Sequence, residues 1–155
     1  MLRSQKKLGE ILLERGLIRQ DELDAALAQQ RRTKEFLGKI LVKTGMIKER
    51  ELLETLSAQF NIPFISVKDR YINWEFVKTF SASLIVDYGC FPLERDDWSV
   101  TIAITNPLDA WALAEAERQA GGLRLKIVLV SSEEMAGLLQ RYQQYMRGNI
   151  PGMFK

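Results

Sequence analysis

The first 60 residues carry apolar positions with the spacing of short amphipathic helices. These positions recur at intervals of three and four residues, at Leu8, Ile11, Leu12, Leu23, Ala26 and Leu27. Gly16 interrupts the pattern where a helix end favours a left-handed residue, a conformation that glycine adopts without steric cost. Asp21 and Glu22 follow, and acidic residues favour the positive end of the next helix. The pattern therefore predicts two short helices joined by a tight turn.

The same segment occurs twice, because Lys7–Gln30 aligns without a gap with Phe36–Gln59 at an offset of 29 residues. Ten of the 24 aligned positions are identical, namely Leu8/Leu37, Gly9/Gly38, Ile11/Ile40, Leu12/Leu41, Gly16/Gly45, Ile18/Ile47, Glu22/Glu51, Leu23/Leu52, Leu27/Leu56 and Gln30/Gln59. Gly45 takes the place of Gly16 as the predicted helix end. This internal duplication predicts about four short helices in residues 1–60.

Residues 71–148 have a mixed pattern that predicts a small α/β domain with about three strands. β-branched alternation in VTIAIT follows a turn at Arg95–Asp97, which indicates two antiparallel strands, and LKIVLVS predicts a third. NWEFVKTFSASLIVDYG is predicted to form one helix or two short ones that end at Gly89. A turn at Asn106-Pro107 precedes a second predicted helix, DAWALAEAERQAGG. The last predicted helix is SEEMAGLLQRYQQYM, and Ser131 and Glu134 form a capping box at its start.

The expected fold class is α+β, with an N-terminal bundle of about four short helices followed by the small α/β domain. The predicted boundaries are 1–60 for the helical subdomain, 61–70 for a linker or short strand, 71–148 for the α/β subdomain and 149–155 for a flexible tail. Pro63 interrupts helix in FNIPFISV, where a short strand is expected.

Two pairs of repeated positions are not explained by an apolar core alone. Gly9 and Gly38 lie at the start of or inside the first helix of each copy, where glycine costs roughly 0.5–1 kcal/mol relative to alanine. They indicate a close approach to the backbone by another helix or by a ligand. Gln30 and Gln59 end each copy on an apolar face, and their amides can bond the edge of a base. A hydrogen bond from each glutamine to neighbouring backbone is the alternative.

Composition and charge limit the function classes. The chain of 155 residues is 46% hydrophobic, which suffices for one sizeable core or two small ones. A net charge of +2 does not indicate nucleic-acid binding. Residues 1–60 carry 12 Lys and Arg against 9 Asp and Glu, so this part is mildly basic and suits a small anionic ligand.

The chain lacks the residues that several kinds of chemistry require. Histidine is absent, which removes the usual general base, and with the single Cys90 this argues against a zinc site. Cys90 is expected to be a small buried hydrophobe in a reducing compartment. No apolar run reaches the roughly 18 residues of a membrane span, and no basic-then-apolar leader pattern is recognised, so we expect no segment that spans or crosses a membrane. The carboxylates Asp96, Asp97 and Asp109 have turn and helix-start roles that explain them.

No phosphate-binding loop of the form GxxxxGK[ST] occurs, because Gly38 and Lys39 are followed by Ile40. We therefore expect no enzyme in this chain. The expected catalytic and metal-binding sets are both empty.

The paired segments resemble the tandem 24-residue motif of the MshE-type N-terminal domain. That domain stands at the front of type II secretion and type IV pilus assembly ATPases, and it binds the bacterial second messenger cyclic di-GMP. The resemblance rests on the repeated Leu, Gly and Gln positions and on the five-residue spacer RRTKE. ITNPLDAWALAEAER and VLVSSEEMAGLLQRYQ resemble the remainder of the same region. The family's first motif position is typically arginine, where this chain has Lys7 and Phe36.

The resemblance implies one half-site in each copy for each guanylate of cyclic di-GMP, and no cofactor besides this ligand. Leucines would contact ribose and base faces, the glycine backbones would permit close approach, and the glutamines would bond guanine edges. The implied ligand-binding residues are Arg3, Lys7, Leu8, Gly9, Leu12, Gly16, Leu23, Leu27, Gln30, Arg31, Arg32, Phe36, Leu37, Gly38, Leu41, Gly45, Leu52, Leu56 and Gln59.

Two functions follow as hypotheses. The first is a cyclic di-GMP-binding regulatory domain, favoured by the Gly and Gln positions that both copies keep. The alternative is a ligand-free docking module that attaches a secretion or pilus ATPase to its inner-membrane platform protein, favoured by Lys7 and Phe36. Both imply a cytoplasmic location, at the inner face of the inner membrane through a partner, without nucleic acid and without direct membrane insertion.

Overall fold

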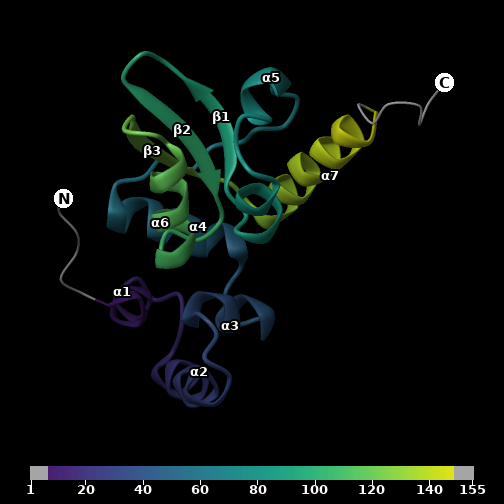
Figure 1. Cartoon of the computed structure of the whole chain (residues 1–155). Helices are drawn as coiled ribbons and strands as arrows, with labels where there is room; N and C mark the ends of the chain where they lie inside the picture. Colours follow the sequence, from purple (N-terminus) through teal and green to yellow (C-terminus); the bar gives the residue numbers. More distant parts are fainter. Residues whose placement is uncertain (1–6, 149–155) are drawn as a thin grey trace. The chain divides into compact units, whose positions relative to one another are not determined.

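The computed structural model describes residues 7–148, and the chain divides into one compact unit that ends at Ile62 and a second that begins at Pro63 (Figure 1). Arg3 and the predicted tail at 149–155 lie outside the described residues. The described part of the first unit contains the helices α1 (Leu8–Glu14), α2 (Gln20–Thr33), α3 (Leu37–Lys43) and α4 (Glu49–Phe60). The predicted four short helices are confirmed.

The same turn ends α1 and α3. Gly16 and Gly45 have φ angles of +72° and +80°, so both adopt the left-handed conformation predicted from the sequence. The Gly16 N–H donates to the Leu13 carbonyl, and the Leu17 N–H donates to the Leu12 carbonyl, both at 3.0 Å. The second copy repeats these two bonds from Gly45 to Val42 at 3.1 Å and from Met46 to Leu41 at 2.9 Å. Both turns are Schellman motifs.

The five-residue spacer RRTKE between the two copies is partly helical. α2 continues through Arg31 and Arg32 and ends at Thr33. Lys34 then takes a left-handed φ of 63°, and its N–H donates to the Gln30 carbonyl at 2.8 Å. The connection to α3 is therefore only three residues long.

Within the first unit, α3 packs against α1, α2 and α4. The residues with at most 1% of their surface exposed are Leu12, Ala26, Ile40, Leu41, Leu53 and Thr55. Most of the apolar residues that are identical in the two copies are buried. Burying one such side chain contributes about 1.5–3 kcal/mol.

The second unit is built on a three-stranded sheet in the order β1-β2-β3. Its elements are α5 (Trp74–Val77), the π-helical turn η1 (Ser83–Asp87), β1 (Phe91–Arg95), β2 (Ser99–Ile104), α6 (Ala110–Gln119), β3 (Arg124–Leu129) and α7 (Ser132–Gly148). β1 and β2 are antiparallel and β2 and β3 are parallel, with α6 as the crossover (Figure 1). The predicted fold class is thus confirmed.

The segment FNIPFISV, where the sequence predicts a linker or a short strand, contains no named strand. It makes one isolated parallel bridge, between Phe64 and Leu129. The chain leaves the sheet directly afterwards, because the Val67 N–H and the Ser66 hydroxyl donate to the Glu134 carboxylate on α7 at 2.6 and 2.8 Å. The bonds to the Glu134 carboxylate thus take the place of further backbone hydrogen bonds between this segment and β3.

The polar residues at the turns have the structural roles expected for them. Asp96 accepts hydrogen bonds from the Trp98 and Ser99 N–H groups at 2.8 and 2.7 Å, and these bonds lower the pKa of its carboxyl group. Asp109 caps α6 by accepting from the Ala112 N–H at 3.1 Å. Cys90 is fully buried, and burial raises the pKa of its thiol to about 12.

In the part of the chain that the structure describes, no helix combines the length and the apolar character needed to cross a bilayer.

Candidate functional site

The two repeated glycines allow helices to pack closely within each copy. A Cβ atom at Gly38 would lie 2.8 and 3.0 Å from the two δ-carbons of Leu52, and one at Gly9 would lie 2.8 Å from Cδ1 of Leu23. Real Cβ atoms do not approach carbon atoms this closely, so a leucine occupies the space that a side chain would need. Of the two alternatives left by the sequence, a neighbouring helix fills this side of each glycine. Ligand contact at their backbones stays a prediction.

Most of the leucines in the implied site are core residues. The exposed fraction is 7% for Leu8, 0% for Leu12, 7% for Leu23, 0% for Leu41, 8% for Leu52 and 2% for Leu56. A side chain without exposed surface touches a solute only if the helices separate. Leu27 and Leu37 are half-buried and are the accessible members of the set.

The repeated glutamates Glu22 and Glu51 have a helix-capping role. The Arg19 N–H donates to Glu22 Oε1 at 2.8 Å, and the Lys48 N–H donates to Glu51 Oε1 at 3.1 Å. Each glutamate is the third residue of its helix and satisfies a backbone donor at the helix start. Their identity in the two copies is therefore explained by folding.

Gln30 and Gln59 lie near the ends of α2 and α4, and both are half-buried. The Gln30 amide Nε2 donates to the Glu35 carbonyl at 3.1 Å. A bond of this kind to neighbouring backbone is the alternative to base recognition that the sequence left open. It uses one of the two hydrogens of the amide. Base recognition by these amides stays a prediction.

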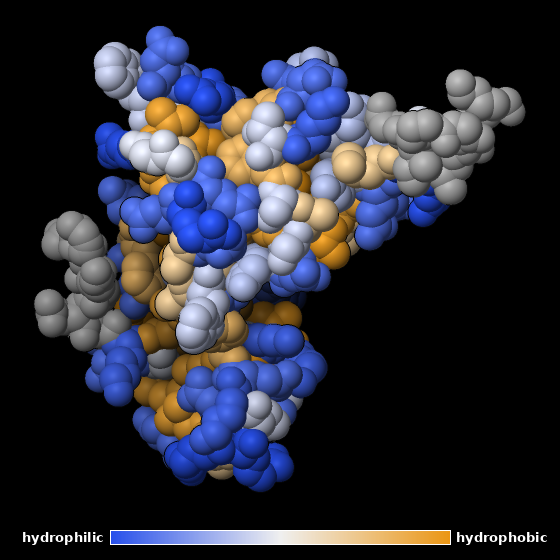
Figure 2. Space-filling model, viewed as in Figure 1, coloured by the Kyte–Doolittle hydropathy of each residue, from blue (hydrophilic) through white to orange (hydrophobic). Residues whose placement is uncertain are grey.

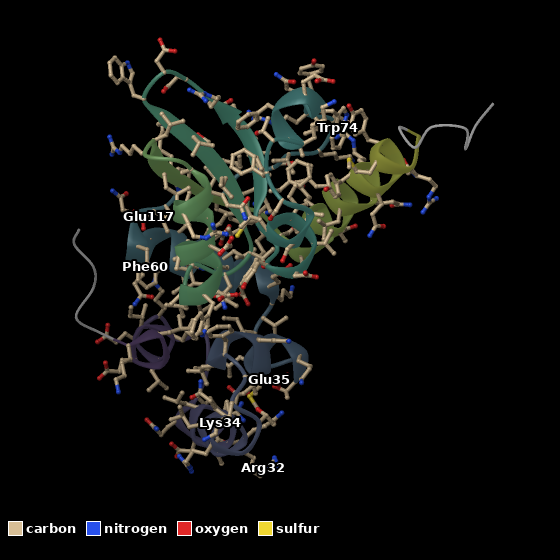
Figure 3. All side chains as sticks on the ribbon, in the orientation of Figure 1. Arg32, Lys34, Glu35, Phe60, Trp74 and Glu117 are labelled. Carbon is tan, nitrogen blue, oxygen red and sulfur yellow. The ribbon has the colours of Figure 1, made fainter. Side chains whose placement is uncertain are left out.

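Cations gather where α2 meets α3. Arg31, Arg32 and Lys34 are exposed, and within residues 7–148 none of the three forms an ion pair. Arg32, Lys34 and Glu35 lie at this junction (Figure 3). Hydrophilic residues predominate at the bottom of Figure 2, with smaller hydrophobic patches among them. Glu35 is already engaged, because Lys43 Nζ donates to its Oε1 at 2.9 Å and thereby lowers the pKa of its carboxyl group. The junction thus offers unpaired positive charge to an anion.

The first motif positions have the same structural place in both copies. Lys7 is the N-cap of α1, and Phe36 is the N-cap of α3. Lys7 is exposed, and Phe36 keeps 40% of its surface exposed. Both side chains are accessible, one as a cation and the other as an aromatic face.

The second unit contains a cavity of about 470 Å³ that no sequence interpretation anticipated. It is lined by Val67, Lys68, Asp69, Glu133, Glu134, Gly137, Leu138 and Arg141. The expected capping box is only half formed, since the Glu134 N–H bonds Ser131 Oγ at 3.1 Å while its carboxylate bonds Ser66 and Val67. Charges of both signs line this cavity, so it favours no ligand class.

The MshEN domain matches residues 60–149 of the chain. Among solved structures, MshE with cdg (cyclic di-GMP) is similar with a TM-score of 0.80 and 24% identity over 89% of this chain and 99% of that one. The N-terminal domain of XpsE matches in two crystal forms. One has a TM-score of 0.71 and 21% identity over 92% of this chain and 97% of that one. The other has a TM-score of 0.58 and 22% identity over 92% and 99%. No curated protein matches the chain. At these identities, the likeness to the solved structures establishes the fold.

Proposed function

Because the chain belongs to the MshEN domain family, we propose that it is a regulatory domain that binds cyclic di-GMP. The ligand would lie on the first unit, across the two repeated segments. The domain would couple the concentration of this messenger to the activity of a secretion or pilus motor in the cytoplasm. The fold that this chain shares with MshE with cdg supports the choice of ligand.

The observation that carries the proposal is the pair Gln30 and Gln59. Folding accounts for the repeated Gly16 and Gly45 through their turns, and for Glu22 through its cap. The glutamines are identical, half-buried and at matching places near the ends of α2 and α4. Cyclic di-GMP contains two guanines and two phosphates, so a duplicated protein segment can offer one amide to each guanine edge.

The accessible residues around each glutamine suit the other parts of the ligand. Arg31 and Arg32 present guanidinium groups, which bind phosphate through paired N–H donors. Phe36 can stack on a guanine face, and Lys7 can neutralise a phosphate as a point charge. The buried leucines then act by shaping the helices that carry these groups.

Isothermal titration calorimetry of the full chain with cyclic di-GMP tests this proposal, with GTP and cyclic di-AMP titrated separately as control ligands. We expect saturable one-to-one binding of cyclic di-GMP alone. Gln30→Ala and Gln59→Ala should each raise the Kd about tenfold or more, because a guanine group is left without its partner. Gln20→Ala is the matched control, since Gln20 bonds only Asp24 on the exposed face of α2.

A docking module without a ligand is the second candidate, and Lys7 and Phe36 favour it because both replace the family's arginine. The substitutions Lys7→Arg and Phe36→Arg separate the two candidates. If the first motif position contacts the dinucleotide, the double variant should bind it more tightly than the natural chain. The absence of heat and of any thermal shift, in both proteins, would exclude binding and direct attention to the inner-membrane platform partner.

A further inference from the structure

β3 is an edge strand of the sheet in the second unit (Figure 1). The Arg124 N–H donates to the Trp98 carbonyl at 2.9 Å, on the side of β2. Because successive residues of a strand face opposite edges, the backbone groups of Lys126 also face β2, whereas those of Leu125 and Ile127 face away from the sheet.

Only one end of this outer edge is paired. The Leu129 N–H donates to the Pro63 carbonyl at 2.7 Å, and the Ile65 N–H donates to the Leu129 carbonyl at 2.9 Å. Within residues 7–148, no backbone group bonds the outward N–H and C=O groups of Leu125 or Ile127. An edge with unpaired groups is a template for a further strand.

The side chains of β3 define what such a strand must carry. Arg124 and Lys126 are exposed on one face of the sheet, and Leu125 and Ile127 are half-buried on the other. An added strand would place alternate side chains beside the two cations and the others beside the two apolar residues. The Asp96 carboxylate attracts Lys126, but its main partners are the Trp98 and Ser99 N–H groups, which donate two hydrogen bonds to it.

We propose that the outer edge of β3 binds an extended segment of a partner protein in which acidic and apolar residues alternate. The segment would add to the sheet as a fourth strand, with main-chain hydrogen bonds to Leu125 and Ile127. A second copy of β3 is disfavoured as the occupant, because it would bring Arg124 and Lys126 against like charges. The edge is thus selective for negative charge.

Fluorescence anisotropy of the full chain with a labelled, end-blocked peptide of about eight alternating glutamate and valine residues tests this surface. A lysine–valine peptide of the same length is the control ligand. We expect the acidic peptide to bind at least about tenfold more tightly, and the double variant Arg124→Glu/Lys126→Glu to reverse that order. Lys78→Glu/Arg147→Glu changes the charge equally elsewhere on the second unit and should leave the order unchanged.

N-methylated peptides distinguish strand addition from charge attraction without altering the protein. Methyl groups on the amides that face β3 should abolish binding, while methyl groups on the alternate amides should leave it intact. Equal binding of acidic and basic peptides, or equal binding of the two methylated peptides, overturns the proposal. In that case Arg124 and Lys126 serve only to keep a bare edge from pairing.

Discussion

The two copies of the repeated segment fold with the same devices but bury different residues. Both use a left-handed glycine to end the first helix and a glutamate at the third position of the second helix. Ile40, however, is fully buried, whereas its counterpart Ile11 is half-buried. Leu56 is 2% exposed, whereas Leu27 is half-buried. Identical residues therefore do not have identical roles.

The two copies also differ in how their first helices pack. α3 packs against all three other helices of the unit, whereas α1 packs against α3 and α4. A duplicated sequence thus folds into an arrangement in which one copy supplies more of the core. Gln30 and Gln59 are retained as well, and a shared role for their amides stays a prediction, because the Gln30 amide also bonds the Glu35 carbonyl.

Truncation of Ile11 and Ile40 should give the largest difference between the copies in the free energy of unfolding. Ile40→Ala removes a side chain with no exposed surface and should lower the free energy of unfolding by about 3 kcal/mol. Ile11→Ala should lower it by only about 1 kcal/mol, because part of that side chain is already in water. Urea unfolding of the full chain, followed by far-ultraviolet circular dichroism, measures both. Equal losses would mean that the copies contribute equally to the core.

The helix-ending glycines should show the opposite result, with no difference between copies. Gly16→Ala and Gly45→Ala each force a side chain into left-handed backbone, at a cost of about 1–2 kcal/mol. No atom lies within 4 Å of the added Cβ at either site, so strain is the whole effect. Asparagine tolerates this conformation better, and Gly16→Asn and Gly45→Asn should recover part of the loss in the same urea experiment. A loss at only one site would contradict the equivalence of the turns.

Sequence patterns predicted the elements that depend on local chemistry. The turns at Gly16 and Gly45, the strand pair around Asp96 and the helix start at Asp109 all follow from bonds within a few residues. The family resemblance added the fold. Burial was not available from the same patterns, because the periodicity that marks Ile11 and Ile40 as apolar is identical while their neighbours are not.

Features built from distant residues were not predicted. Glu134 fits a capping-box pattern, yet its carboxylate bonds Ser66 and Val67, which are more than 60 positions away. The cavity beside it is likewise lined by residues from both stretches of the chain, 67–69 and 133–141. The bare edge of β3 likewise became visible only with the strand order, because Arg124 and Lys126 read as ordinary surface charges until their neighbours are known. The ligand-binding set itself stays a prediction.

Adding a methyl group to the packed glycines gives a smaller difference between copies. Gly38→Ala crowds both δ-carbons of Leu52, at 2.8 and 3.0 Å, so turning that side chain does not relieve the contact. Gly9→Ala crowds mainly one δ-carbon of Leu23, at 2.8 Å, with the other at 3.3 Å. After the gain in helix propensity, we expect a net loss of about 1 kcal/mol for Gly38→Ala and a change near zero for Gly9→Ala. Thermal unfolding of the two variants side by side tests the order, and the reverse order would contradict it.

The smallest effect concerns Glu35, which has no counterpart in the second copy because the position 29 residues on is Phe64. Lys43 holds the pKa of the Glu35 carboxyl below its ordinary value of 4.5. A carboxylate with a lowered pKa contributes stability at neutral pH, and this contribution is lost as the pH falls through the lowered pKa. Glu35→Gln should therefore lower the Tm slightly at pH 7, and the difference from the natural chain should shrink below pH 4.5 and vanish once the pH is below the lowered pKa. The effect is small because solvent screens the ion pair between Glu35 and Lys43.

Glu54→Gln is the control, because it removes the more exposed ion pair between Glu54 and Arg50. Its change in Tm at neutral pH should be smaller still. If the two variants behave alike at every pH, the junction between the copies has no electrostatic role of its own.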